Sequence, residues 1–106
     1  METKLSKRLE TVADFVPQGA RLVDVGSDQA YLPLFLVEQK RIDFAIAGEV
    51  VQGPYQSALQ HVELAGRSDM IQVRLANGLA AVDDQDQISA VQVAGVGGRS
   101  IADIVE

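Results

Sequence analysis

Apolar side chains at the start of the chain recur with the period of a helix. Between residues 4 and 16 they are spaced by four, three and four positions, which places them on one helix face. These positions are Leu5, Leu9, Val12 and Val16. The Pro-Gln-Gly sequence at 17–19 predicts the turn that ends this helix.

Two strand–turn–helix units follow. Residues 21–25 form a short β-branched run that leads into a glycine turn, and residues 32–39 return to a helical pattern. Residues 44–49 are typical of a buried strand. Residues 54–65 are typical of a helix, with a proline at the first position and a glycine just past the last. This alternation indicates an α/β protein.

The last part of the chain predicts two further strands. Residues 71–75 alternate between apolar and polar side chains, and residues 89–94 form another apolar run. Between them, we expect the acidic sequence at 83–86 to be a poorly ordered loop. The glycine-rich sequence at 95–98 predicts the start of a helix that continues to Glu106.

Strands that alternate with helices predict a mostly parallel sheet. Right-handed crossovers leave few arrangements for four strands, and we expect the order 3-2-1-4. The fourth strand would then be an edge, although it is apolar on both faces, and such edges promote association. We therefore expect either a domain truncated after this strand or a second chain, such as a copy of the same protein, that covers the edge.

The composition is that of one soluble globular domain over residues 1–106, with 47% apolar and 23% charged residues. The chain contains no cysteine, which excludes disulfides and cysteine-ligated metals. The sequence shows no secretion signal, and no apolar run approaches the roughly 20 residues that span a bilayer. We expect a cytoplasmic protein that is not embedded in a membrane.

The formal charge of −6 is unevenly distributed. Residues 42–106 carry three of the nine basic residues but nine of the fifteen acidic ones, so this part would repel a nucleic-acid backbone. Lys4, Lys7 and Arg8 lie on one face of the first predicted helix. They are candidates for contact with RNA phosphate, and a solvated helix face is the alternative.

Candidate chemistry gathers where the predicted strands end. In an open parallel sheet, ligands bind beyond the carboxyl ends of the strands, where the strand order reverses, here between the first and fourth strands. Each strand is followed there by acidic, amide or glycine residues. These are Asp24, Gly26 and Asp28 after the first strand, Glu49 after the second, Asn77 and Gly78 after the third, and Gly95, Gly97 and Gly98 after the fourth.

The turn after the first strand argues against a dinucleotide. Gly26 is followed by Ser-Asp-Gln-Ala-Tyr, so the G-x-G-x-x-G spacing is missing. Asp28 would also compete with a pyrophosphate for the N-terminus of the next helix. The carboxylates of Asp24 and Asp28 suit a ligand that carries an ammonium and a sulfonium but no phosphate. The alternative for Gly26 is a turn that binds nothing.

Glu49 lies 23 residues beyond Gly26, close to the separation of about 20 residues at which an acid after the second strand accepts ribose hydroxyls. Asn77 and Gly78 could read the edge of an adenine. Each has a simpler alternative, because an acid at a strand end can be solvated and Asn-Gly is a common turn.

Three further residues have both a functional and a structural interpretation. Tyr31 could stack on a base or serve in packing. Arg99, after the glycine-rich sequence, could contact phosphate or be a solvated helix residue. His61, the one histidine, is expected to be an exposed helix residue, so we predict no metal site.

Four motifs, in order, resemble a known family. They are Asp-Val-Gly-Ser-Asp-Gln-Ala-Tyr-Leu-Pro at 24–33, Ala-Gly-Glu-Val-Val-Gln-Gly-Pro-Tyr at 47–55, Arg-Leu-Ala-Asn-Gly-Leu at 74–79 and Ala-Gly-Val-Gly-Gly-Arg at 94–99. They are similar to the motifs of the bacterial tRNA (adenine(22)-N1)-methyltransferases, from about Leu5 to the last residue. The resemblance implies a Rossmann-like class I fold that uses S-adenosyl-L-methionine to methylate N1 of an adenine in tRNA.

The resemblance also implies a role for each candidate residue. Asp24, Gly26 and Asp28 would surround the methionine part of the cofactor, Glu49 would hold its ribose, Asn77 and Gly78 would flank its adenine, and Gly95 to Gly98 would line the slot for the target base. Asp28 and Tyr31 are the catalytic candidates. Gly97, Gly98 and Arg99 join the basic residues of the first helix as candidate RNA contacts.

The sequence departs from the family in two residues and in length. The family usually has His where Gln29 stands and Met where Val96 stands, so roles for an imidazole or a thioether are not carried over. The family also continues through further strands and a mostly helical C-terminal domain that help hold the tRNA. Two alternatives stay open: a non-catalytic fragment that binds the cofactor or dimerises, and a nicotinamide-dependent oxidoreductase.

Overall fold

Helices and strands alternate along the chain as the apolar pattern predicts. The computed structural model describes residues 7–27, 30–76, 82–93 and 101–103. The helices are α1 (Lys7–Asp14), α2 (Tyr31–Glu38) and α3 (Gln52–Leu64), and a short 3-10 helix, η2, spans Asp84–Asp86. The strands are β1 (Arg21–Val25), β2 (Phe44–Glu49), β3 (Ile71–Leu75), β4 (Ala90–Val93) and β5 (Ile101–Asp103). β1, β2 and β3 have the predicted bounds.

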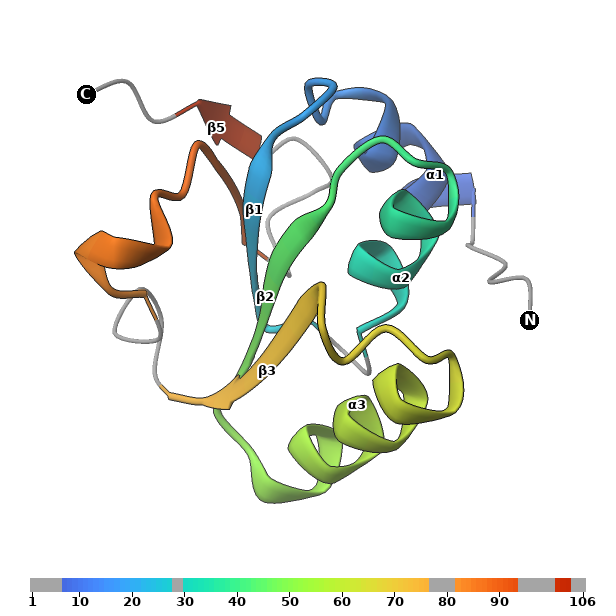
Figure 1. Cartoon of the computed structure of the whole chain (residues 1–106), viewed down its shortest axis with the longest axis vertical. Coiled ribbons are helices and arrows are strands. Elements are labelled where there is room, and N and C mark those ends of the chain that lie inside the picture. Colours follow the sequence, from blue (N-terminus) through green and yellow to red (C-terminus); the bar gives the residue numbers. More distant parts are fainter. Residues whose placement is uncertain (1–6, 28–29, 77–81, 94–100, 104–106) are drawn as a thin grey trace.

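The strands form one sheet in the order β3-β2-β1-β4-β5, and Figure 1 shows β1, β2 and β3 side by side. β1 pairs in parallel with β2 and with β4, and β2 pairs in parallel with β3. The predicted order 3-2-1-4 is therefore confirmed. The strand order reverses between β1 and β4, so a ligand of this sheet would bind beyond their carboxyl ends.

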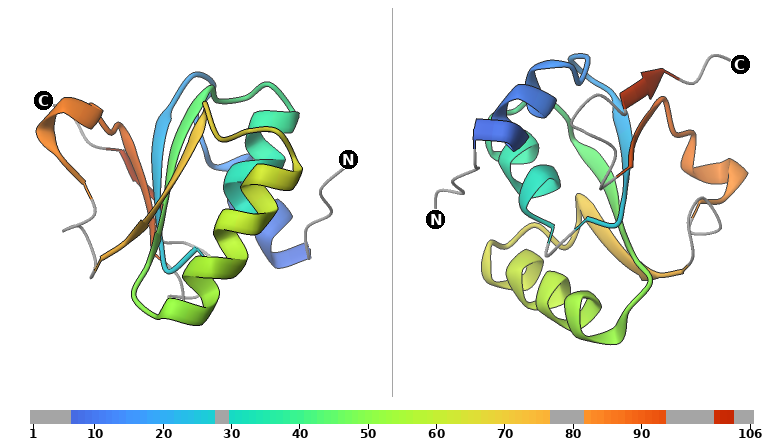
Figure 2. Two further views of the ribbon diagram at one scale, coloured as in Figure 1. Left: turned by 60° about the horizontal axis from the view of Figure 1, so that its bottom comes forward. Right: turned by 180° about the vertical axis from the view of Figure 1, so that it is seen from behind.

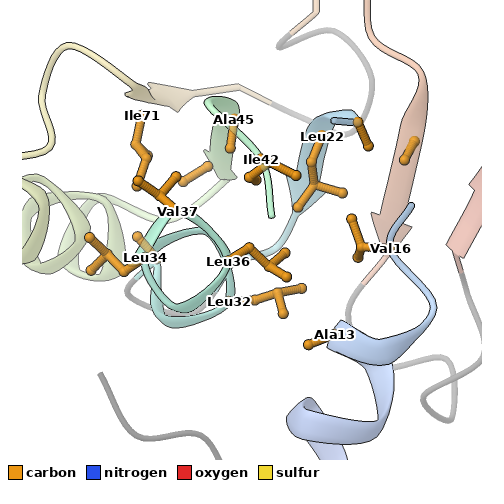
Figure 3. Close-up of a cluster of buried hydrophobic side chains, with 14 of the residues drawn as sticks. Ala13, Val16, Leu22, Leu32, Leu34, Leu36, Val37, Ile42, Ala45 and Ile71 are labelled. Carbon is orange, nitrogen blue, oxygen red and sulfur yellow. The ribbon is translucent and has the colours of Figure 1, made fainter. Parts of the chain in front are cut away.

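Helices α1, α2 and α3 all cover one face of the sheet (Figure 2). Alternate residues of each strand point to this face and join the helices in a hydrophobic cluster (Figure 3). Its fully buried members include Leu22, Leu36 and Ile71. A smaller cluster around Val23 and Ile46 lies on the opposite face, on the side of η2. Because both faces are buried, β2 is apolar along nearly its whole length, up to Glu49 at its end.

Helices α2 and α3 end in the same motif, with a left-handed residue just past the last turn. After α2, Lys40 has φ 58°, and its N–H donates to the carbonyl of Val37 at 3.0 Å. The N–H of Arg41 donates to the carbonyl of Leu36, also at 3.0 Å. After α3, Gly66 has φ 70° in an equivalent turn. This is the Schellman motif, in which glycine avoids the steric cost of left-handed backbone.

Replacing Lys40 by glycine should stabilise the protein by about 0.5–1 kcal/mol, because relief of left-handed strain exceeds the added entropy of the unfolded chain. The measurement is the free energy of unfolding in urea. The matched control is Gly66→Lys, which introduces the same strain after α3 and should destabilise. A Lys40→Gly variant that is less stable than the parent would contradict this account.

The end of the chain differs from the prediction. Residues 101–103, expected within a helix, form β5, which pairs antiparallel with β4 and places Ile101 opposite Gln92. The unpaired backbone of an apolar edge strand favours pairing strongly enough to override a weak local preference. β4 is therefore not an open edge, and that prediction is wrong. The expected association of two copies through an open β4 edge is therefore no longer supported, because β5 covers that edge.

The acidic segment at 83–86 is ordered, contrary to the prediction. The side chain of Asp83 accepts a hydrogen bond from the N–H of Gln85 at 3.0 Å and caps η2. Arg74 on β3 donates two hydrogen bonds to the buried carboxylate of Asp86, from Nη1 to Oδ2 at 2.7 Å and from Nη2 to Oδ1 at 3.0 Å. The partner lies twelve residues earlier, so the local acidity of the segment gave no sign of it.

Asp86→Asn should destabilise the protein by about 1–2 kcal/mol at pH 7, the range for a partly buried charged hydrogen bond. Hydrogen bonds from Arg74 hold the pKa of Asp86 below its usual value. Burial raises this pKa, but its effect is smaller. A carboxyl with a lowered folded pKa stabilises above its unfolded pKa and loses that contribution as pH falls below about 4.

The test compares the free energies of unfolding of the parent and Asp86→Asn at pH 7 and at pH 3. The difference between them should shrink at pH 3. Asp84→Asn, an exposed neighbour in η2, should have little effect at either pH. A difference for Asp86→Asn that is the same at both pH values would rule out the ion pair as its source.

Candidate functional site

The turn after β1 lies against the end of β2. The N–H groups of Gly26 and Ser27 both donate to the carbonyl of Gly48, at 2.8 and 3.1 Å. Gly26 has φ 69°, a left-handed value that glycine adopts without steric cost. The predicted glycine turn is confirmed, and these hydrogen bonds fix it beside Glu49.

Asp24 and Glu49 lie on the same face of the sheet. Asp24 on β1 pairs with Ala47 on β2, and Glu49 follows two residues later, so both side chains point to the face covered by the helices. They are buried, with 4% and 5% of their surfaces exposed. Carboxylate oxygens accept hydrogen bonds from hydroxyl groups and attract cations, so this edge suits a ligand with hydroxyl or cationic groups.

The end of β3 also meets Glu49. Leu75 pairs with Glu49 in the ladder, and the N–H of Ala76 donates to the Glu49 carbonyl at 2.8 Å. Ala76 is the residue before Asn77. Ala76 therefore lies beside Glu49, the predicted ribose-binding residue, and the predicted Asn77 and Gly78 lie outside the described residues.

β4 contributes a polar residue that the sequence analysis missed. Gln92 lies opposite Asp24 in the parallel pairing of β4 with β1, and it is buried. The sequence could have indicated this residue, because Gln92 is the one polar residue in the strand Ala90–Val93. A buried amide in such a strand needs hydrogen-bond partners. The carboxylate of Asp24 and the amide of Gln92 thus share one level of the sheet where the strand order reverses.

Sequence comparison assigns the family. Residues 5–106 match the family described as "Methyltransferase domain". The chain belongs to this methyltransferase family. The sheet described above therefore belongs to a methyltransferase domain. Its strand order reverses between β1 and β4, and it carries acids at the ends of β1 and β2.

Three relatives show what this methyltransferase domain is similar to. It is 46% identical over 105 residues to the tRNA (adenine(22)-N(1))-methyltransferase of Bacillus subtilis, covering 99% of this chain. A Streptococcus pneumoniae structure assigned as a tRNA (m1A22) methyltransferase in complex with S-adenosyl-L-methionine is 64% identical, with a TM-score of 0.85 over 91% of this chain. A homologue from M. capricolum in complex with S-adenosyl-homocysteine is 35% identical, with a TM-score of 0.80 over 86% of this chain.

The methyltransferase domain spans less than half of each of these relatives, namely 44%, 45% and 41% of their lengths. The resemblance that four motifs predicted is confirmed by these matches. The cofactor, the substrate and the activity named for the relatives belong to those longer proteins.

Tyr31 and His61 form a contact that changes the interpretation of both. Tyr31 begins α2, and its ring stacks on that of His61 in α3, with centroids 5.1 Å apart and an angle of 26° between the planes. Tyr31 is about one third exposed, at 37%. His61, expected to be exposed, is half-buried. The prediction for His61 is therefore wrong, because its ring is covered by an aromatic residue 30 positions earlier.

Several predicted site residues lie outside the described residues, so their roles stay predictions. They are Lys4, Asp28, Asn77, Gly78, Gly95, Gly97, Gly98 and Arg99. Of the predicted RNA contacts, Lys7 is exposed at the start of α1, and Arg8 follows it in the same helix.

A cavity of about 280 Å³ lies at the opposite edge of the sheet. Residues from the turns that precede β1, β2 and β3 line it, among them Gly19, Arg41 and Met70. It is therefore separate from the candidate site at the carboxyl ends. Within the described ranges, no group of three or more His, Cys, Asp or Glu residues could hold a metal, and no helix has the length and hydrophobicity to span a membrane.

Proposed function

We propose that this chain forms the cofactor-binding part of an enzyme that transfers a methyl group from S-adenosyl-L-methionine to N1 of the adenine at position 22 of tRNA. One observation carries the proposal: the buried carboxylates of Asp24 and Glu49 share a face at the carboxyl edge of the sheet, beside the Gly26 turn. Relatives with 64% and 35% identity were solved with S-adenosyl-L-methionine and S-adenosyl-homocysteine.

The residues at this edge fit such a cofactor. Glu49 offers two carboxylate oxygens, which can accept both hydroxyls of a ribose. Asp24, and Asp28 outside the described residues, offer negative charge to an ammonium or a sulfonium. The hydroxyl of Ser27, directly after Gly26, is buried without a hydrogen-bond partner in the described part of the chain, as expected of a site that is completed by a ligand.

The proposed chemistry needs positioning more than proton transfer. When bound, S-adenosyl-L-methionine supplies the methyl group. N1 of adenine has a free lone pair in the plane of the ring, so no strong base is needed, and the protein must hold this atom in line with the methyl donor. We assign Asp28 to stabilise the positive charge that develops on the adenine, or to accept a proton from its exocyclic amine. Tyr31 would border the target base.

The RNA must present an unpaired adenine, because N1 is engaged in base pairing within a duplex. The acidic balance of residues 42–106 disfavours contact with the RNA backbone there. We therefore propose that Lys7 and Arg8, together with Lys4, contact phosphate, and that the further length seen in the relatives contributes to holding the tRNA. Arg99, after the glycine-rich sequence, would add a local contact in the otherwise acidic part. We place the protein in the cytoplasm, where bacterial tRNA is found.

Calorimetry with the 106-residue chain tests the cofactor assignment. We expect binding of S-adenosyl-homocysteine and no binding of NAD. Binding of NAD alone would support the oxidoreductase alternative, and binding of neither would support a fragment without cofactor affinity. Methyl transfer is tested separately with S-adenosyl-L-methionine and tRNA transcripts. A transcript with guanine at position 22 should accept no methyl group under conditions in which the adenine transcript is methylated.

A further inference from the structure

The stack of Tyr31 on His61 joins two helices at a point close to the candidate site. Tyr31 is the first residue of α2, which follows the Gly26 turn, and His61 lies in the last turn of α3. Their ring centroids are 5.1 Å apart. Figure 1 shows α2 and α3 as neighbours on the same face of the sheet. The contact therefore holds the start of α2 against α3.

The start of α2 needs such support because its backbone is strained. Ala30, the N-cap residue, has φ 65° and ψ 22°, and no side chain caps the helix there. Left-handed backbone is unfavourable for any residue that carries a Cβ, and it persists only where surrounding contacts fix it. Ala30 is fully buried, and its carbonyl accepts the N–H of Leu34 at 3.1 Å. Burial and the neighbouring ring stack thus hold Ala30 in place.

The Gly26 turn and the start of α2 are each held by contacts with a neighbouring element. The turn is tied to β2 by the two hydrogen bonds to the Gly48 carbonyl. At the start of α2, Ala30 is followed at once by the stacked ring of Tyr31. Tyr31 is a catalytic candidate of the proposed function, so the position of its ring matters for a ligand at this edge.

We propose that His61 is a positioning residue for the candidate site. Its ring fixes Tyr31 and the start of α2, which follows the Gly26 turn in the chain. The effect on ligand affinity rests on the proposed function, whereas the effect on the backbone at α2 does not. His61 acts through Tyr31, on which its ring stacks.

The test uses His61→Ala, which removes the ring, and His61→Phe, which keeps an aromatic ring in its place. Gln60→Ala, an exposed neighbour in α3, is the control. The first measurement is amide hydrogen exchange at Leu34, whose N–H bonds Ala30. The second is the affinity for S-adenosyl-homocysteine by calorimetry. Exchange at Ala45, whose N–H bonds the Met70 carbonyl in the sheet region, reports on global stability.

We expect His61→Ala to raise exchange at Leu34 and to weaken ligand binding, each by about three- to tenfold, the range expected for one aromatic pair. Exchange at Ala45 should change less. His61→Phe should restore both values, and Gln60→Ala should change neither. Adding Tyr31→Ala to His61→Ala should have little further effect on exchange at Leu34, because the pair is already broken.

Two results would overturn the proposal. One is unchanged exchange at Leu34 in His61→Ala. The other is an increase at Leu34 and Ala45 by the same factor that His61→Phe does not reverse, since this indicates a general loss of stability. If the parent chain binds no S-adenosyl-homocysteine, the proposed function fails, and the exchange data still decide whether His61 fixes the start of α2.

Discussion

Glu49→Ala should weaken the binding of S-adenosyl-homocysteine by about 1–3 kcal/mol, which is roughly a 5- to 150-fold increase in Kd. Glu49 is buried at the end of β2, where the turn of Gly26 and the end of β3 both approach its backbone. In the proposed site its carboxylate accepts both ribose hydroxyls. Alanine would leave these hydroxyls without their acceptors in a place that water reaches poorly. Calorimetry measures the change directly.

Two controls separate a lost contact from a lost fold. Glu63→Ala removes an exposed acid from α3 and should leave the Kd unchanged. Glu49→Gln keeps the size of the side chain and one acceptor oxygen, so it should weaken binding less than alanine does. If Glu49→Ala remains folded, as judged by thermal unfolding, and binds the ligand as tightly as the parent, Glu49 lies outside the site.

The sheet could be predicted from the sequence because its central strands are buried on both faces. Residues 21–25 and 44–49 have the predicted bounds, and the right-handed crossovers leave little choice of order for four parallel strands. The strand at 101–103 could not be predicted in the same way. It pairs with β4 through backbone hydrogen bonds, and these depend on an adjacent strand more than on the local sequence.

Some residues of the candidate site could be predicted from the sequence in the same way, and others could not. Asp24, Gly26 and Glu49 could be predicted because each comes at or directly after a strand end, and parallel strands bring those ends together. The contact between Tyr31 and His61 could not, since no periodicity links a residue at the start of one helix with a residue in the next. The pairing of Arg74 with Asp86 was hidden for the same reason. Contacts of this kind depend on how helices and loops pack onto the sheet.

Gly26→Ala and Gly19→Ala should have similar effects on stability and different effects on binding. Both glycines adopt left-handed backbone, with φ 69° and φ 79°, so alanine should cost about 1–2 kcal/mol at either position. Gly19 lies in the turn before β1, at the amino edge of the sheet, and a Cβ there would meet no atom within 4 Å. Gly19→Ala therefore introduces the same backbone strain as Gly26→Ala, but at a position away from the candidate site.

Only Gly26→Ala should weaken binding of S-adenosyl-homocysteine, by about tenfold or more, because a steric conflict of roughly 1.4 kcal/mol already has this effect. A Cβ at position 26 would occupy the place where a ligand approaches the backbone of the turn. Urea unfolding and calorimetry on the two variants provide the comparison. Equal loss of affinity in both would mean that binding follows stability, and the turn after β1 would then have no direct role in holding the ligand. Loss in Gly26→Ala alone would place the ligand at this turn, on the same edge of the sheet as Asp24 and Glu49.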